Sequence, residues 1–166
     1  MIFNASATHA LRAAQHLAGR SPAEVVLGRD LAARIDVPAH YLAKVLATLA
    51  RAGLLAASRG ARGGYRLARR PSEITLLQLV EPFEGRRIRP GCLLRPDSPC
   101  SDDGACGAHR TWAGVKETWL RFLETTTLAD LAGPARPLAP VTPPRRSRRR
   151  SRGAPAPRAA PAHRPA

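Results

Sequence analysis

Two short amphipathic patterns joined by a three-residue turn constrain the fold of this 166-residue chain most strongly. Residues 28–35 predict a helix whose inner face carries Leu31, Ala32 and Ile35. After a tight turn at 36–37, Pro38 suits the first position of a second helix, where its missing N–H has no intrahelical partner. That helix has apolar residues at i, i+3, i+4 and i+7, namely Leu42, Val45, Leu46 and Leu49. The two helices together form a helix-turn-helix.

A glycine-rich hairpin is predicted directly after the second helix, which we expect to end at Gly53. Residues 54–59 and 65–67 flank the turn at 60–64, and short runs around such a turn are typical of a β-hairpin. A hairpin that follows a helix-turn-helix is a wing. Residues 51–70 contain six arginines and no acid, and those at the tip can reach phosphates or the minor groove, namely Arg59 and Arg62.

The outer face of the second helix is the candidate surface for base contacts. When such a helix enters the major groove, its N-terminal residues face the base edges. The candidate residues are Ala39, His40, Tyr41, Lys44 and Thr48. The alternative is a winged helix that contacts only protein, and the arginines of the hairpin argue against it.

Three further helices are predicted from apolar spacing. The first covers residues 6–19 with Ser6 as its N-cap. A second, over 76–81, follows a capping box formed by Thr75 and Gln78. The third covers 107–126, and its apolar residues step by three, four and three, as in a heptad seam: Trp112, Val115, Trp119 and Phe122. This seam is either monomer core or a dimer interface. We favour the interface, because specific helix-turn-helix binding commonly uses two half-sites.

All three cysteines of the chain lie within 15 residues, in the pattern C-x7-C-x5-C-x2-H. The candidate metal ligands are Cys92, Cys100, Cys106 and His109. Cys106 and His109 are one helical turn apart at a predicted helix start, so both can point at one ion. Three thiolates and an imidazole suit structural zinc or an iron–sulfur cluster. The short cysteine knuckles of typical zinc sites are absent, which favours iron–sulfur. Thiol redox chemistry without metal is a further alternative.

The net charge of +15 is concentrated in two places. One is the arginine-rich stretch 51–70. The other is the segment 134–166, which contains nine of the 16 prolines, nine arginines and no acid. Such a segment cannot bury enough apolar surface to fold, so we predict a disordered basic tail. It is either a solvated tail or a non-specific phosphate-binding arm. A separate alternative for the whole protein is a nucleic-acid-coating protein whose binding depends on this tail.

The sequence resembles the Rrf-two family of bacterial winged-helix regulators over about residues 1–132. The resemblance depends on R-G-x-x-G-G-Y-x-L at 59–67, on E-I-T-L at 73–76 and on V-P-A-H-Y-L-A-K-V-L at 37–46. The three cysteines and T-L-A-D-L at 127–131 extend it. The family includes iron–sulfur assembly regulators and nitric-oxide-sensitive repressors.

The resemblance implies a homodimeric repressor or activator that binds a double-stranded DNA operator. In cluster-bearing members, three cysteines hold a [2Fe–2S] or [4Fe–4S] cluster, and the state of the cluster changes operator affinity. Cys92, Cys100 and Cys106 match these cysteines, and His109 resembles the histidine that completes the [2Fe–2S] site. Members that sense nitric oxide use an acidic residue near position 8, where this chain has Thr8. This favours [2Fe–2S] over [4Fe–4S], whereas the first cysteine gap is closer to some nitric-oxide-sensing members, so the signal stays open.

These interpretations predict a mainly α fold with a small β-hairpin, a winged helix-turn-helix plus a long C-terminal dimerisation helix. The expected parts are a DNA-binding domain over 1–85, a cluster-binding cysteine loop over 86–106, the dimerisation helix and a turn over 107–133, and the tail. No motif indicates an enzyme or a small-molecule substrate. No apolar run approaches the ~20 residues of a membrane span. The odd number of cysteines fits a reducing cytoplasm better than a disulfide framework.

Overall fold

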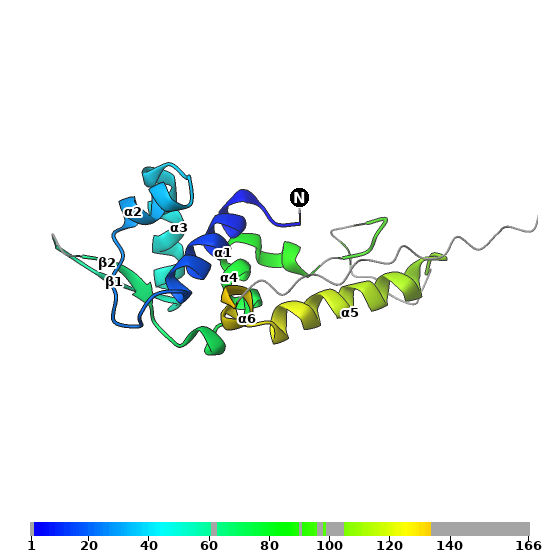
Figure 1. Cartoon of the computed structure of the whole chain (residues 1–166). Helices are drawn as coiled ribbons and strands as arrows, with labels where there is room; N and C mark the ends of the chain where they lie inside the picture. Colours follow the sequence, from blue (N-terminus) through cyan, green and yellow to red (C-terminus); the bar gives the residue numbers. More distant parts are fainter. Residues whose placement is uncertain (1, 61–62, 90, 96–97, 99–104, 134–166) are drawn as a thin grey trace, which may run out of the picture. The chain divides into compact units, whose positions relative to one another are not determined.

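A computed structural model describes residues 2–60, 63–89, 91–95, 98 and 105–133. Contacts divide the chain after Pro134, and the predicted tail over 134–166 lies outside the described residues. The elements, in chain order, are α1 (Ala5–Ala18), α2 (Gly28–Arg34), α3 (Ala39–Arg51), β1 (Leu55–Ser58), β2 (Gly64–Leu67), η1 (Pro71–Glu73), α4 (Leu76–Glu84), η2 (Gly85–Ile88), α5 (His109–Thr125) and α6 (Leu128–Ala132) (Figure 1). The predicted mainly α fold with one small hairpin is confirmed.

Helix α1 is the centre of the core and packs against α3, α4 and α6. Its inner face is a ridge of alanines with no exposed surface: Ala7, Ala10, Ala13 and Ala14. Small side chains at a helix contact shorten the distance between helix axes, so the neighbouring helices approach α1 closely. Leu11 and Ala18 flank this ridge and are half-buried.

The predicted N-cap of α1 is wrong. Asn4 is the N-cap, and its side-chain oxygen accepts a hydrogen bond of 2.9 Å from the backbone N–H of Ala7. Ser6 lies inside the helix, and its hydroxyl is 2.7 Å from the hydroxyl of Tyr41 on α3. Asparagine and serine are comparable N-caps. Asn4 takes the capping position here, and the hydroxyl of Ser6 instead contacts Tyr41.

Helices α2 and α3 end in the same way, with a residue in the left-handed region and a backbone bond back into the helix. At the end of α2, Asp36 has φ 54° and Val37 donates to the carbonyl of Ala32 at 3.0 Å. At the end of α3, Gly53 has φ 70° and Leu54 donates to the carbonyl of Leu49 at 3.0 Å. Both are Schellman motifs. The turn between α2 and α3 is therefore fixed by backbone hydrogen bonds. Its left-handed residue is Asp36, and aspartate adopts this conformation at a lower cost in free energy than most residues.

Three predicted helix boundaries need correction. Pro38 is the N-cap of α3 rather than its first residue. Helix α4 continues past the predicted end to Glu84, with Pro82 in its last turns. Helix α5 begins at His109, two residues later than expected. The apolar spacing predicted α4 and α5 themselves. Pro82 led to an early end for α4, and Gly107 led to an early start for α5.

The starts of α4 and α6 are joined by a short antiparallel bridge between Thr75 and Thr127. Leu76 donates to the carbonyl of Thr126 at 2.9 Å, and Leu128 donates to the carbonyl of Ile74 at 2.7 Å. Both threonines also cap their helices, and the predicted capping box of Thr75 with Gln78 is confirmed. In the second box, the hydroxyl and the backbone N–H of Thr127 donate to Asp130 and lower the pKa of that carboxyl. We call this pairing of residues 74–76 with 126–128 the joint.

Candidate nucleic-acid interface and cysteine segment

The outer face of α3 is exposed because its opposite face is held in the core. Four apolar side chains of α3 are buried: Leu42, Val45, Leu46 and Leu49. Of the candidate DNA-binding residues, Ala39, His40 and Lys44 are exposed, whereas Tyr41 and Thr48 are half-buried. The hydroxyl of Thr48 donates to the carbonyl of Lys44 at 3.1 Å and accepts from Arg51 at 3.1 Å.

Tyr41 faces α1 rather than standing free on the outer face, which corrects its expected placement. Its hydroxyl meets that of Ser6, and the ring of His9 contacts it edge-on with centroids 5.6 Å apart. The Nδ1 atom of His9 is buried and has no hydrogen-bond partner among the residues that the structure describes. Tyr41 therefore fixes the start of α3 against α1.

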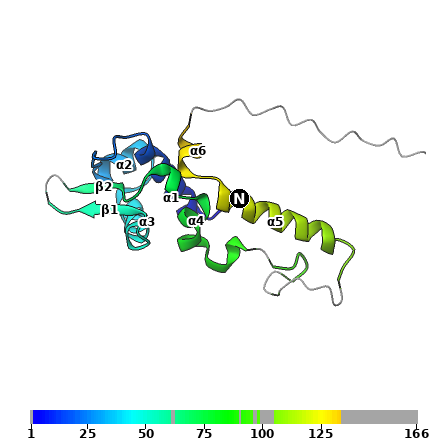
Figure 2. The same ribbon diagram turned by 90° about the horizontal axis from the view of Figure 1, so that it is seen from below.

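The wing is an antiparallel pair in which Leu55 lies opposite Leu67 and Ser58 opposite Gly64 (Figure 2). The sequence missed a third segment of this sheet, because Val26 exchanges two backbone bonds of 2.9 Å with Tyr65. A Cβ atom at Gly64 would collide with the carbonyl of Val26, so glycine is required for this close approach. Arg59 is exposed near the end of β1, and Arg62 lies outside the described residues.

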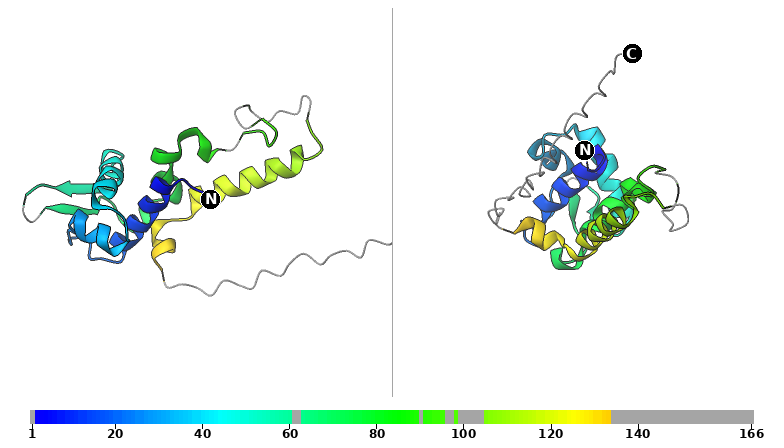
Figure 3. Two further views of the ribbon diagram at one scale, coloured as in Figure 1. Left: turned by 90° about the horizontal axis from the view of Figure 1, so that it is seen from above. Right: turned by 90° about the vertical axis from the view of Figure 1, so that its right-hand side faces the viewer.

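The cysteine segment is attached to the start of α5. The indole N–H of Trp112 donates to the carbonyl of Gly91 at 2.8 Å, and Gly91 directly precedes Cys92. The backbone N–H of Cys92 donates to the carbonyl of Ser98 at 2.9 Å, which folds the segment back on itself. Residues 91–95 accordingly lie beside the first turns of α5 (Figure 3).

Cys106 and His109 lie in one turn that leads into α5, whose first residue is His109. The backbone N–H of His109 donates to the carbonyl of Cys106 at 2.9 Å. Because Ala108 is the N-cap, Cys106 precedes the helix and His109 is its first residue. Cys92, Cys106 and His109 are half-buried, and Cys100 lies outside the described residues. Among the described residues, no three histidine, cysteine or acidic side chains form a metal-binding group.

The seam of α5 is divided between the core and the surface. Trp119 packs against Phe3, with ring centroids 5.5 Å apart, and donates to the carbonyl of Ile88 at 3.2 Å. Val115 and Phe122 remain 50% and 47% exposed. A hollow of about 300 Å³ lies beside Val115, and its lining residues are Ile2, Glu84, Arg87, Ile88, Trp112, Val115, Lys116 and Trp119. The tryptophans therefore belong partly to the monomer, and the role of the seam in a dimer stays a prediction.

The described helices include none that is both long and apolar enough to cross a membrane.

A helix-turn-helix followed by a wing is the architecture of a DNA-binding transcription factor. The family model described as "Rrf2: Iron-dependent Transcriptional regulator" matches residues 3–134. The chain belongs to the Rrf2 family of transcriptional regulators, which are DNA-binding proteins rather than enzymes.

Named relatives agree with this assignment. A protein of Aquifex aeolicus named as an HTH-type transcriptional regulator is 33% identical over 140 residues, covering 79% of this chain and 91% of the relative. The HTH-type transcriptional regulator NsrR of Geobacillus kaustophilus is 31% identical over 123 residues, covering 74% of this chain and 84% of the relative.

Solved structures have the same fold. CymR, the global cysteine regulator of B. subtilis, superposes with a TM-score of 0.68 at 26% identity, over 78% of this chain and 95% of that chain. IscR of T. potens superposes with a TM-score of 0.61 at 26% identity, over 77% of this chain and 83% of that chain.

The two lysines of the chain provide a matched test of the α3 surface. Lys44 is exposed on α3, and Lys116 lies on α5. We expect Lys44→Ala to weaken binding to a random-sequence duplex and to reduce the salt dependence of the affinity by about one phosphate contact. Fluorescence anisotropy across a salt series measures both. Lys116→Ala is the control, and an equal effect of the two substitutions would contradict this interface.

Proposed function

We propose that this protein is a repressor whose operator binding is controlled by an iron–sulfur cluster. Cys92, Cys100 and Cys106 hold the cluster, and His109 completes its ligand set. The observation that carries the proposal is the bond between Trp112 and Gly91. It attaches the residue before Cys92 to the first turn of α5, beside the turn that contains Cys106 and His109.

The donor set fits such a group. Cysteine thiolates are the usual ligands of iron–sulfur clusters, and replacement of some by histidine is known. Cys92, Cys106 and His109 are half-buried, so the site is partly shielded from water. When bound, the cluster supplies a centre whose loss or oxidation changes the charge and the cross-links at the start of α5.

A [2Fe–2S] cluster is favoured over [4Fe–4S] because α1 offers no acidic ligand near position 8. Thr8 stands there, and its hydroxyl donates to the carbonyl of Asn4 at 3.1 Å. Two described histidines remain as donors for a fourth ligand, His109 beside Cys106 and His9 beside Thr8.

The alternative is a winged-helix regulator that has a zinc or bare-thiol site and no cluster. The similarity to CymR, described as a global cysteine regulator, favours this alternative, whereas the iron-dependent description of the family model favours iron. The cluster, zinc and bare-thiol sites all use the same cysteines, so they are distinguished by whether a metal is bound and by which metal it is.

Anaerobic purification distinguishes these sites by colour and composition. The wild-type protein should absorb in the visible range and contain iron and acid-labile sulfide in equal amounts, about two of each per chain. Cys92→Ala should lose the colour, whereas Ser98→Ala, in the same segment, should keep it. A colourless wild-type protein with stoichiometric zinc, or with no metal, would contradict the cluster.

We also infer that the protein is a homodimer formed along α5. Val115 and Phe122 are exposed apolar residues on the seam of this helix, and a helix pair buries residues at this spacing. Two copies present two α3 helices, which suits an operator with two half-sites.

Sedimentation velocity tests the dimer. Phe122→Glu should convert a dimer into a folded monomer, because a charge is costly to bury in an apolar interface. Val25→Glu is the matched control, since Val25 is an exposed apolar residue outside α5. A wild-type monomer, or a Phe122→Glu variant that stays dimeric, would rule out this interface.

A further inference from the structure

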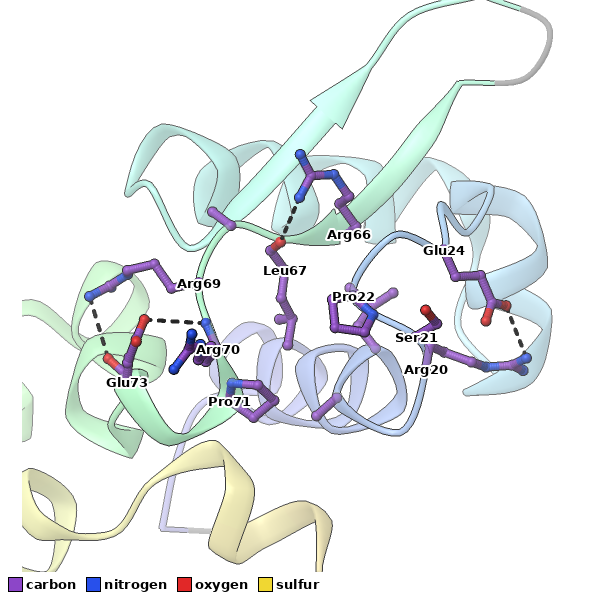
Figure 4. Close-up of a pocket in the computed structure, with 13 residues that line it drawn as sticks. Arg20, Ser21, Pro22, Glu24, Arg66, Leu67, Arg69, Arg70, Pro71 and Glu73 are labelled. Atoms are coloured by element: carbon purple, nitrogen blue, oxygen red, sulfur yellow. Dashed lines mark hydrogen bonds and ion pairs between the residues drawn. The ribbon is translucent and has the colours of Figure 1, made fainter.

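A hollow of about 560 Å³ lies at the base of the wing, away from the cysteine segment (Figure 4). It is enclosed by the end of α1, the segment 20–24, the end of β2 and the start of η1. Pockets for small organic ligands have volumes of this size. Neither the DNA-binding face of α3 nor the cysteine site accounts for it.

The floor of the hollow is apolar. Leu17 of α1 is buried and Leu67 of β2 is half-buried beside it. Pro22 and Pro71 lie on either side of Leu67 in Figure 4. This floor is suited to a hydrocarbon or aromatic group, because the contact would remove apolar surface of both the ligand and the protein from water.

The rim of the hollow is positively charged. It contains four arginines and two glutamates: Arg20, Arg66, Arg69, Arg70, Glu24 and Glu73. Arg20 is paired with Glu24 at 3.1 Å, and Arg69 donates to the carbonyl of Glu73 and to Gln78, both at 3.4 Å.

Among the described residues, only Arg20 of the four pairs with a carboxylate, and Arg66 and Arg70 also make no hydrogen bond from the guanidinium to another side chain. Arg66 donates only to the backbone carbonyl of Leu67, at 3.4 Å. The Glu73 carboxylate accepts from the backbone N–H of Arg70, at 3.3 Å, rather than from its guanidinium. Within the described ranges, the guanidinium groups of Arg66 and Arg70 therefore keep donors available for an anion.

We propose that this hollow binds a small amphipathic organic anion, a carboxylate attached to a hydrocarbon or aromatic body. In Figure 4 the side chains of Arg66 and Arg70 lie apart on the rim of the hollow. Each guanidinium group matches a carboxylate, which a single arginine can bind through two parallel hydrogen bonds. The apolar floor holds the body of the ligand, which a bare phosphate or a DNA backbone would leave unused. The proposal goes beyond the function proposed above and does not depend on it.

The position of the hollow connects it to the wing. Arg66 belongs to β2 and lies opposite Ala56 of β1. The segment 20–24 leads into Val26, whose backbone pairs with Tyr65. A ligand in the hollow therefore contacts both the wing strand β2 and the segment 20–24, which leads to the residue that pairs with β2, Val26.

Isothermal titration with two matched probes tests the site. We expect 3-phenylpropionate to bind the full-length protein at least tenfold more tightly than 3-phenylpropionamide, which has the same body without the charge. The double variant Arg66→Gln/Arg70→Gln should lose at least tenfold in affinity for the carboxylate. Arg29→Gln/Arg121→Gln removes two exposed arginines elsewhere and should bind as the wild type does.

A second variant keeps the test decisive if the double variant does not fold. Ser21→Asp places a negative charge on the exposed rim and should weaken carboxylate binding by a similar factor. Circular dichroism confirms folding of each variant. The proposal is overturned if the carboxylate does not bind at millimolar concentration, if the amide binds equally well, or if the folded variants bind like the wild type. Equal competition by inorganic phosphate would also overturn it, by assigning the arginines to phosphate alone.

Discussion

The joint between residues 74–76 and 126–128 is the constraint on which the rest of the structure depends. Its two backbone hydrogen bonds, of 2.9 and 2.7 Å, join the segment that follows the wing to the segment that follows α5. Ile74, Leu76 and Leu128 are buried there, so the bonds are shielded from water. Because α4 and α6 both begin at the joint and both pack on or next to α1, the direction of α5 is fixed by the same core that holds α3.

Single hydrogen bonds hold the parts of the chain that lie between the cysteine segment and the candidate DNA-binding face of α3. Trp112 attaches the cysteine segment to α5, Trp119 attaches α5 to η2, and Ser6 attaches α1 to Tyr41 at the start of α3. Each attachment is a single hydrogen bond, and Trp119 and Tyr41 also pack against the hydrophobic core. A ligand shifts such an equilibrium only by binding one arrangement more tightly than the other.

Local patterns predicted most of the fold and only part of the site. The helix-turn-helix, the wing and the capping box of Thr75 followed from spacing within a few residues. The alanine ridge of α1, the bridge of Val26 and the inward position of Tyr41 did not, because each depends on a contact between residues far apart in the sequence. The ligand set is a prediction from the sequence, and the bond from Trp112 to Gly91 adds that Cys92 lies near the start of α5. The hollow beside Arg66 and Arg70 left no sequence signal, since two stretches far apart in the sequence, 17–24 and 66–73, line it.

The most direct test of the central claim is the affinity of the protein for DNA in two states of its cysteine site. The duplex is one selected from random sequence by the wild-type protein, and its binding is measured anaerobically before and after removal of iron by a chelator. Our account predicts a change of at least tenfold for the wild type, about 1.4 kcal/mol, and no change for Cys92→Ala. Equal affinity of the wild-type protein in both states would contradict it.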